Sequence, residues 1–266
     1  MSLRVFITGG ASGLGRAIAE RYARDGARVC IGDVHEKRSE ETRLALGPHA
    51  HAIRCDVTKE DDLVAAARWC EQNWGGIDIV VNNAGVAASG PIEATSMADW
   101  AWIVDINLLG VVRGCKAFVP MLKRQHSGHI VNVASMAGLI NPPGAAAYNA
   151  TKAAVVSVSE TLRVELAGDN IQIHVVCPAF VRTNLLENFR GATEDADRVT
   201  RRLVSRAKMG PAEVADIVHR GVARGDFHIL THSEGKQAWL FKRFAPGALF
   251  VRVARKRAAR AMARRP

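Results

Sequence analysis

The amino-acid sequence predicts an α/β fold with a parallel sheet covered by helices on both faces. Short runs rich in valine and isoleucine alternate with longer helix-patterned segments along most of the chain. Strands that are almost continuously apolar are typical of parallel sheets buried on both sides. A glycine cluster separates the first apolar run from the first helical pattern. Because crossovers between parallel strands are right-handed, these elements should form one doubly wound sheet.

The expected strands and helices follow one another in order. Strands are expected at residues 3–8, 27–33, 51–57, 77–85, 128–135, 171–178 and 226–230. Helices are expected at about 13–24, 36–46, 59–74, 97–124 and 147–168, and from Pro211 onward. Residues 184–210 are polar and irregular, which favours a mobile lid. No linker divides the chain up to residue 235, so residues 1–235 are expected to form one domain.

The positive charge of the chain is concentrated in its last segment, residues 236–266. The net charge is +10, and ten of the 36 Lys and Arg residues lie in this tail, which has no acidic residue. The remaining 26 basic residues balance 26 acidic ones. Apolar side chains alternate with the basic ones, and Pro246-Gly247 divide the tail into two pieces. The second piece has an apolar stripe at helical spacing, formed by Val251, Ala254, Ala258, Ala261 and Met262.

Three interpretations of this tail remain open. A basic amphipathic segment suits peripheral contact with an anionic membrane surface. It also suits packing of its aromatic residues on a neighbouring subunit or on the substrate cleft. Nucleic-acid binding is the least favoured of the three.

Cysteine and histidine usage predicts neither disulfides nor a metal site. The five cysteines are odd in number, form no C-x-x-C pair and lie mostly in apolar stretches, as expected for reduced packing residues. The nine histidines form no cluster with metal-ligand spacing. Met1-Ser2 lead directly into the first strand, which leaves no room for a signal peptide. We therefore expect a cytoplasmic protein, and peripheral contact with a membrane is one of the open interpretations of its tail.

The glycine cluster T-G-G-A-S-G-L-G at residues 8–15 predicts a phosphate site. A strand, a glycine turn and a helix point backbone N–H groups and the helix N-terminus at a phosphate. Asp33 ends the second strand eighteen residues after Gly15, where a carboxylate can bind ribose hydroxyls and repel a 2′-phosphate. The other role for Asp33 is a helix N-cap. This pattern favours NAD over NADP, although Lys37 and Arg38 lie nearby.

Several motifs together resemble the short-chain dehydrogenase/reductase family, in its short single-domain branch. The resemblance extends from Leu3 to about Leu230. It rests on T-G-x-x-x-G-x-G at residues 8–15, N-N-A-G at 82–85, Asn107, Ser135, and Y-x-x-x-K at 148–152. Each motif is modest alone, but their order and spacing are specific.

The resemblance implies a seven-stranded Rossmann sheet, a homodimer or homotetramer, and a set of site residues. The catalytic residues implied are Ser135, Tyr148, Lys152 and Asn107. Those implied to bind the cofactor are Gly9, Ser12, Gly13, Leu14, Gly15, Asp33, Asp56, Val57, Asn83, Ala84, Gly85, Tyr148, Lys152, Pro178, Val181 and Thr183. The family's nicotinamide-side loop usually begins with Pro-Gly, whereas this chain has Pro178-Ala179. The added methyl group puts the backbone conformation of that loop in question.

Tyr148 and Lys152 lie one helical turn apart and therefore on one face. An alcohol releases hydride only as its proton is removed, so the base must work near neutral pH. Tyrosine has a pKa of about 10, and a nearby ammonium favours the phenolate. Lys152 is expected to lower the pKa of Tyr148 and to bond the nicotinamide ribose. Ser135 is expected to hold the substrate oxygen. Asn107 is expected to hold a water molecule that links Lys152 to solvent.

Each of these residues alone has an ordinary structural explanation. A Tyr–Lys pair at this spacing usually lies on the surface, and a serine at the end of a strand is usually part of a turn. An asparagine within a helix usually points at solvent. Their combination downstream of a dinucleotide loop favours catalysis. The sequence therefore predicts an NAD-dependent oxidoreductase that interconverts a secondary alcohol and a ketone, with a hydrophobic or lipid-like substrate. The alternatives are an NADP-dependent carbonyl or 3-oxoacyl reductase and a dinucleotide-binding regulator without turnover.

Overall fold

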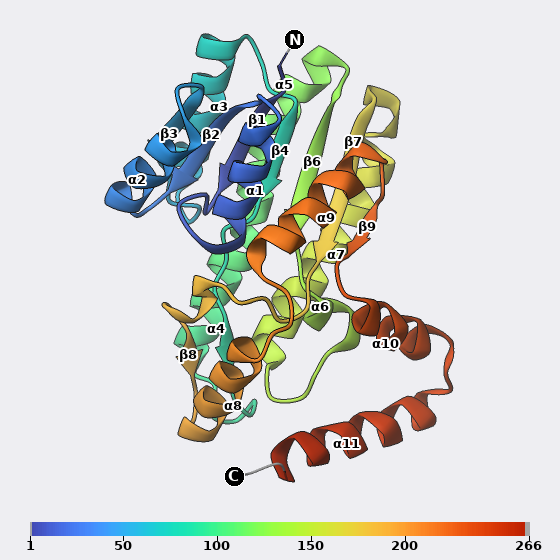
Figure 1. Ribbon diagram of the computed structural model, residues 1–266. Helices are drawn as coiled ribbons and strands as arrows, with labels where there is room; N and C mark the ends of the chain where they lie inside the picture. The colour runs from blue at the N-terminus through green and yellow to red at the C-terminus, as the bar shows by residue number, and fades with distance from the viewer. Residues whose placement is uncertain (1, 264–266) are drawn as a thin grey trace.

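The structure, a computed structural model, has one seven-stranded sheet between two layers of helices (Figure 1). It describes residues 2–263, and within the last helix it describes side chains as far as Lys256. All strands of this sheet are parallel, in the order β3-β2-β1-β4-β6-β7-β9. Their bounds are β1 Arg4–Thr8, β2 Arg28–Asp33, β3 Ala50–Arg54, β4 Ile79–Asn82, β6 Gly128–Val133, β7 Ile171–Cys177 and β9 His228–Leu230. The predicted doubly wound fold is confirmed.

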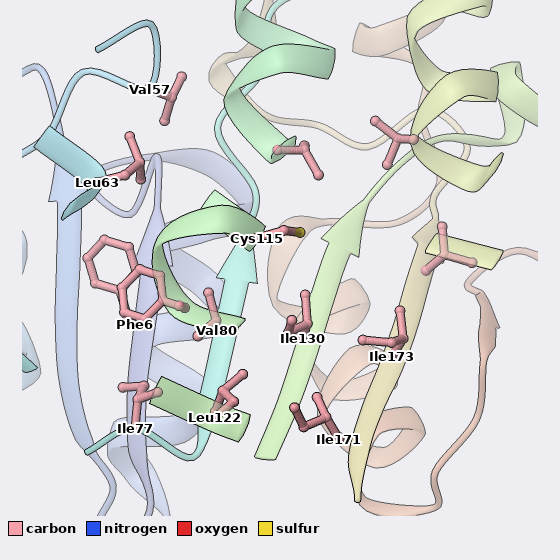
Figure 2. Close-up of a cluster of buried hydrophobic side chains, with 14 of the residues drawn as sticks. Phe6, Val57, Leu63, Ile77, Val80, Cys115, Leu122, Ile130, Ile171 and Ile173 are labelled. Carbon is pink, nitrogen blue, oxygen red and sulfur yellow. The ribbon is translucent and has the colours of Figure 1, made fainter. Parts of the chain in front are cut away.

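Both faces of the sheet are buried because successive side chains of each strand point to opposite sides. One face is covered by α1 (Gly13–Arg24), α2 (Glu36–Leu46) and α9 (Pro211–Ala223). The other is covered by α3 (Glu60–Trp74), α5 (Gly110–Gln125) and α7 (Ala146–Glu165). In β1, Val5 and Ile7 belong to the first core, and Phe6 belongs to the second with Leu122 and Ile130 (Figure 2). This explains the continuous apolar runs in the sequence.

Two predicted strands end earlier than expected. Residues 55–57 follow β3 outside the sheet, and residues 83–85 follow β4 in the same way. Both segments line the cavity at the carboxyl ends of the strands. Binding sites of parallel α/β sheets lie at this edge, near the point where the strand order reverses. Here that point lies between β1 and β4, whose helices α1 and α5 cover opposite faces.

The predicted helix at 97–124 consists of α4 (Met97–Val104), a π-helical turn (Asp105–Leu109) and α5. The region predicted as a lid, 184–210, contains a 3₁₀ turn (Asn184–Leu186), β8 (Arg190–Gly191) and α8 (Glu194–Ser205). Strand β8 pairs with β5 (Ala88–Ser89) in a separate two-stranded sheet. A short helix, α6 (Met136–Ile140), precedes α7. In Figure 1, α4, β8, α8 and the tail lie below the sheet, at the carboxyl ends of its strands.

The tail forms two helices, α10 (Ser233–Phe244) and α11 (Gly247–Ala263), divided at Pro246 as predicted. Helix α10 packs against α6, and α11 extends beneath the body of the molecule (Figure 1). The predicted apolar stripe is divided, because Val251 is exposed whereas Ala254 lines the cavity. Its other members, Ala258, Ala261 and Met262, lie outside the described side chains.

All five cysteines are buried and free, which confirms their predicted packing role. Among the residues described, no group of histidine, cysteine and acidic side chains has the geometry of a metal site. Within residues 2–263, no helix combines the length and apolar character needed to span a bilayer.

Candidate active site

The glycine loop between β1 and α1 has a backbone that only glycine allows at several positions. Gly9 and Gly13 have φ angles of +63° and +54°, a region that other residues rarely adopt. A Cβ atom on Gly15 would lie 2.2 Å from the carbonyl oxygen of Gly9. The start of α1 therefore approaches the loop more closely than any side chain would permit.

The segment after β4 supports this loop from the side. The Asn83 side-chain amide donates hydrogen bonds to the carbonyl oxygens of Thr8 (2.9 Å) and Gly9 (3.2 Å). The Thr8 hydroxyl oxygen accepts from the backbone N–H groups of Asn83 (3.0 Å) and Ala84 (3.1 Å). These bonds join the two predicted motifs, 8–15 and 82–85, into one unit.

Ser12 is the N-cap of α1, yet its side chain makes no capping hydrogen bond. Ser12 lines the cavity together with Gly13 and Leu14. The N-terminus of α1 thus presents backbone N–H groups to the cavity beside positive-φ glycines. This arrangement fits a pyrophosphate, because phosphates bind at such helix N-termini.

Asp33 lies at the end of β2 and also lines the cavity. Its carboxylate accepts hydrogen bonds from the backbone N–H groups of Ala11 and His35, each at 3.0 Å. The N-cap of α2 is His35, so Asp33 is not the N-cap. Each carboxylate oxygen retains a free lone pair for a ribose hydroxyl. Arg38, the cation near this position, forms an ion pair with Glu187 at 2.6 Å.

Lys152 is buried on α7, and its ammonium donates to the carbonyl oxygen of Val133 at 2.9 Å. Burial lowers the pKa of Lys152 to about 8. Its nitrogen lies 5.9 Å from the centre of the Tyr148 ring. In this structure the pKa of Tyr148 is raised by burial, while the Ser135 hydroxyl acts in the opposite direction. The pKa of Tyr148 is therefore not lowered as predicted in this structure, because the effect of burial is the largest.

Ser135 begins α6 and lies between Tyr148 and the loop after β7. Its hydroxyl accepts from the backbone N–H of Ala137 at 3.1 Å and donates to the carbonyl oxygen of Pro178 at 3.3 Å. The serine is thus an N-cap that also contacts the loop after β7, which the resemblance places beside the nicotinamide. It is in position to donate to a substrate oxygen instead of Pro178.

Asn107 lies in the π-helical turn and is fully buried, not solvated. Its side-chain oxygen accepts from the backbone N–H of Val86 (2.8 Å), and its amide donates to the carbonyl oxygen of Val86 (2.9 Å) and to Thr151 Oγ1 (3.4 Å). The side chain that was predicted to hold a water is therefore occupied by protein atoms. It joins the segment after β4 to α7, next to Lys152.

The loop 178–183 closes the other side of the site. Ala179 does not have a positive φ, so the departure from Pro-Gly requires no left-handed residue. Its N–H donates to His232 Nδ1 at 3.3 Å. Thr183 approaches the glycine loop, since a Cβ on Gly13 would lie 3.3 Å from Thr183 Cβ. The predicted conformation problem at Ala179 does not arise.

One cavity of about 2320 Å³ brings the predicted residues together. Every predicted catalytic and cofactor-binding residue lines it except Gly15 and Asn107, which act behind its wall. Phe241 and Phe250 of the tail line the cavity, as expected if the tail aromatics pack on the cleft. Sequence reasoning did not identify many of the other apolar lining residues, including Trp102, Ile140, Phe180, Leu186, Phe189, Val199, Leu203 and Val253. The signal that would have located some of them is the amphipathic pattern at 194–205.

A glycine loop at the reversal point of a parallel sheet, with a Tyr–Lys–Ser group in the same cavity, defines a dinucleotide-dependent oxidoreductase. Residues 4–194 match the short chain dehydrogenase family, and the chain belongs to that family. It is therefore an NAD(P)-dependent enzyme that acts on CH–OH groups.

Similar proteins include dehydrogenases of small alcohols. The 2-(R)-hydroxypropyl-CoM dehydrogenase of Xanthobacter autotrophicus is 34% identical over 226 residues, 82% of this chain and 90% of that protein. A cyclopentanol dehydrogenase of Comamonas sp. is 34% identical over 210 residues, 78% of this chain and 80% of that protein. A short chain dehydrogenase/reductase from Burkholderia phymatum, solved in complex with NAD, has a TM-score of 0.85 and 34% identity, and the match covers 91% of this chain and 93% of that one.

Proposed function

We propose that this protein is an NAD-dependent dehydrogenase that interconverts a hydrophobic secondary alcohol and its ketone, with Tyr148 as the general acid/base. The observation that supports it most is the single cavity that contains both the glycine loop and the group Ser135, Tyr148 and Lys152. A regulator without turnover would not need this group beside the dinucleotide loop.

The residues have separate tasks in this proposal. Ser135 donates a hydrogen bond to the substrate oxygen, and Tyr148 takes the hydroxyl proton of the alcohol. Lys152 holds the nicotinamide ribose and supplies the positive charge that favours the phenolate. A dinucleotide held by these residues would supply the acceptor for the hydride of the carbinol carbon. Asn107 positions Val86 and Thr151 around Lys152 and is thus a positioning residue of the catalytic group.

The remaining predicted residues are proposed to bind the dinucleotide. The loop 9–15 faces the pyrophosphate and Asp33 the adenosine ribose. The adenine side is formed by Asp56 and Val57, and the segment 83–85 braces the loop. On the nicotinamide side we assign Pro178, Val181 and Thr183, since all three line the cavity beside Ser135.

Asp33 supports NAD over NADP because a carboxylate repels a 2′-phosphate. Arg38 is the residue that would favour NADP, and the competing function is an NADPH-dependent carbonyl or 3-oxoacyl reductase. In the structure Glu187 is paired with Arg38, which places a second carboxylate beside this cation. This pairing supports the NAD assignment.

The substrate side of the cavity is mainly apolar, with Trp102, Ile140, Phe189, Val199 and Leu203 among its residues. Hydrophobic side chains at this density favour a hydrocarbon or acyl portion of the substrate over a sugar. The volume also exceeds the roughly 300–1,000 Å³ of common ligand pockets, since one cavity serves both ligands.

A homodimer or homotetramer is proposed through the helices that contain Asn107 and Tyr148. Leu109 in the π turn and Val164 at the end of α7 are exposed apolar residues on these elements. Analytical ultracentrifugation of the purified protein tests this assignment, and a monomer at every concentration would contradict it.

The function is tested by following NADH formation on secondary alcohols of graded chain length, sterols included. Turnover that rises with chain length and disappears in Tyr148→Phe is the expected result. NADH binding without turnover of any alcohol or ketone would instead support the regulator. Faster turnover with NADPH than with NADH would identify the reductase.

A further inference from the structure

The tail is attached directly to the active site through helix α10. Gly235 packs against Met136 so closely that a Cβ atom would lie 3.0 Å from the Met136 side chain. The Lys242 ammonium donates to the carbonyl oxygen of Leu139 at 2.7 Å. Both partners belong to α6, the helix that Ser135 caps. His232, the N-cap of α10, accepts from the N–H of Ala179 in the nicotinamide-side loop.

Helix α11 forms the outer wall of the substrate side. Phe250, Val253 and Ala254 line the cavity, as does Phe241 of α10. Across the cavity lie Val199 and Leu203 of α8, each 40% exposed. Two helices, α8 and α11, thus both contribute apolar side chains to the cleft, and both lie beyond the carboxyl ends of the strands (Figure 1). An apolar chain leaving the cleft would pass between their side chains.

The parts of the tail that do not line the cavity combine exposed apolar residues with positive charge. Phe244, Leu249 and Val251 are 76%, 45% and 53% exposed. Arg252 and Arg255 lie beside Val251 along a shallow groove. No acidic residue occurs anywhere in 236–266, so the positive charge is not balanced within the tail. Exposed apolar side chains among cations, in a segment without acidic residues, favour an anionic, partly apolar surface over a purely ionic one.

We infer that α10 and α11 dock on an anionic lipid surface, and that the substrate cleft opens toward that surface. The charge complementarity selects anionic headgroups, while Phe244, Leu249 and Val251 enter the interface between headgroups and acyl chains. The second half of the inference rests on the proposed hydrophobic substrate: a lipid-like alcohol would enter between α8 and α11 without crossing water.

Vesicle co-sedimentation of the full-length protein tests the docking. Vesicles of phosphatidylcholine with added phosphatidylglycerol are expected to retain the protein, and pure phosphatidylcholine vesicles are not. Because the Debye length falls from about 10 Å at 0.1 M salt to about 3 Å at 1 M, binding should weaken at high salt. The double charge reversal Arg252→Glu, Arg255→Glu should weaken binding about tenfold or more. The triple variant Phe244→Ser, Leu249→Ser, Val251→Ser should also lose binding.

Leu44→Ser is the matched control, because Leu44 is an exposed apolar residue on α2, far from the tail in the sequence and outside the cavity lining. It should bind vesicles as the wild type does. Absence of binding by the wild type, or equal binding by all variants, would overturn the inference. A triple variant that loses self-association but not vesicle binding would show instead that a second copy covers this face. Retention on an oligonucleotide, with none on vesicles, would identify a nucleic-acid contact.

Measurements of turnover distinguish a failure of the membrane docking from a failure of the proposed reaction. None of the substituted tail residues lines the active-site cavity. Turnover of a short water-soluble alcohol without vesicles should therefore be unchanged in both tail variants. For a long-chain alcohol carried in anionic vesicles, the variants should show a raised KM with little change in kcat. If no alcohol is oxidised while vesicle binding still depends on the tail, the docking stands and the proposed function fails.

Discussion

The cofactor side and the substrate side of the cavity are held in very different ways. On the cofactor side, Asn83 and Thr8 fix the glycine loop through four hydrogen bonds, and Asp33 adds bonds to the backbone of Ala11 and His35. On the substrate side, β8 is tied to α4 by the ion pair Arg190–Asp99, and α11 packs against α10. Exposed ion pairs contribute little stability, typically below about 1 kcal/mol each.

This difference indicates that the cofactor side requires a fixed backbone geometry, whereas the substrate side tolerates changes of its side chains. The bonds of the cofactor side involve mainly backbone atoms and glycines, so few substitutions are compatible with them. The substrate side consists of amphipathic helices whose apolar residues can change without disturbing the sheet. The following substitutions test this contrast, beginning with the largest expected effect.

Tyr148→Phe should reduce turnover by roughly 10²–10⁴-fold, the usual contribution of a general acid/base. NADH affinity should stay near the wild-type value, because the ring remains in place. Steady-state kinetics and a fluorescence titration with NADH measure the two effects. Tyr22→Phe is the matched control, since the buried Tyr22 hydroxyl has no hydrogen-bond partner among the described residues. Activity of Tyr148→Phe close to that of Tyr22→Phe would rule out the assignment.

Gly15→Ala should damage the cofactor side specifically. The new methyl group would lie 2.2 Å from the carbonyl oxygen of Gly9, so α1 has to move away from the loop. Overpacking of this kind costs about 1–3 kcal/mol of stability, and NADH should bind at least about tenfold more weakly. In Gly168→Ala, by contrast, the methyl group meets no atom within 4 Å. Calorimetric titration with NADH should distinguish them, and equal affinity in both would refute the close-approach argument.

Lys152→Met should lower turnover strongly yet stabilise the protein below pH 8. The pKa of Lys152 falls from 10.5 to about 8 on folding because burial disfavours its charge. Between these pH values the unfolded chain binds more protons, so wild-type stability rises with pH there. Below pH 8 Lys152 is charged in the folded state as well, so the full cost of burying its charge, about 3 kcal/mol, lowers the stability of the wild type.

Denaturant unfolding of the wild type and of Lys152→Met, at pH 7 and pH 10 and without cofactor, measures the difference in their free energies of unfolding. The stability gain of Lys152→Met should be largest at pH 7 and shrink toward pH 10.5. A gain that does not depend on pH would mean that the buried ammonium is not its source.

Glu187→Gln should have the smallest effect. It removes the carboxylate paired with Arg38, so this cation becomes available to a 2′-phosphate. The preference for NADH over NADPH should fall a few-fold, while stability changes by less than about 0.5 kcal/mol. Glu20→Gln, which breaks the surface pair with Arg16 outside the cavity, serves as the control. An unchanged ratio of kcat/KM for the two cofactors would assign the preference to Asp33 alone.

The contrast also explains which features the sequence predicts. Apolar runs predict strands that are buried on both faces. The motifs at 8–15, 82–85 and 148–152 predict the cofactor side, because its backbone geometry requires particular residues at these positions. The order of strands follows from right-handed crossovers. Whether Tyr148, Lys152 and the glycine loop act together in catalysis is still a prediction, although the structure brings them into one cavity.

Other features depend on tertiary contacts that local patterns do not contain. The pattern at 97–124 is compatible with a single regular helix, and it does not indicate the π turn, from which the buried Asn107 side chain bonds to Val86. The tail pattern shows amphipathic helices but not that Ala254 faces the cavity while Val251 faces outward. The hydrogen bond from Lys152 to the Val133 carbonyl and the burial that raises the Tyr148 pKa are equally absent from the local sequence pattern.

The π turn at Asp105–Leu109 sets the rotational phase between α4 and α5. One additional residue in a helical turn offsets the following side chains by about 100° around the axis. This offset lets α5 direct Phe118 into the core while α4 places Trp102 on the wall of the cavity. A chain shortened by one residue at this turn would keep both helices but bring them into the same phase. If Phe118 stays in the core, Trp102 has to turn away from the cavity, so a deletion that preserves the fold would still reshape the wall of the cavity.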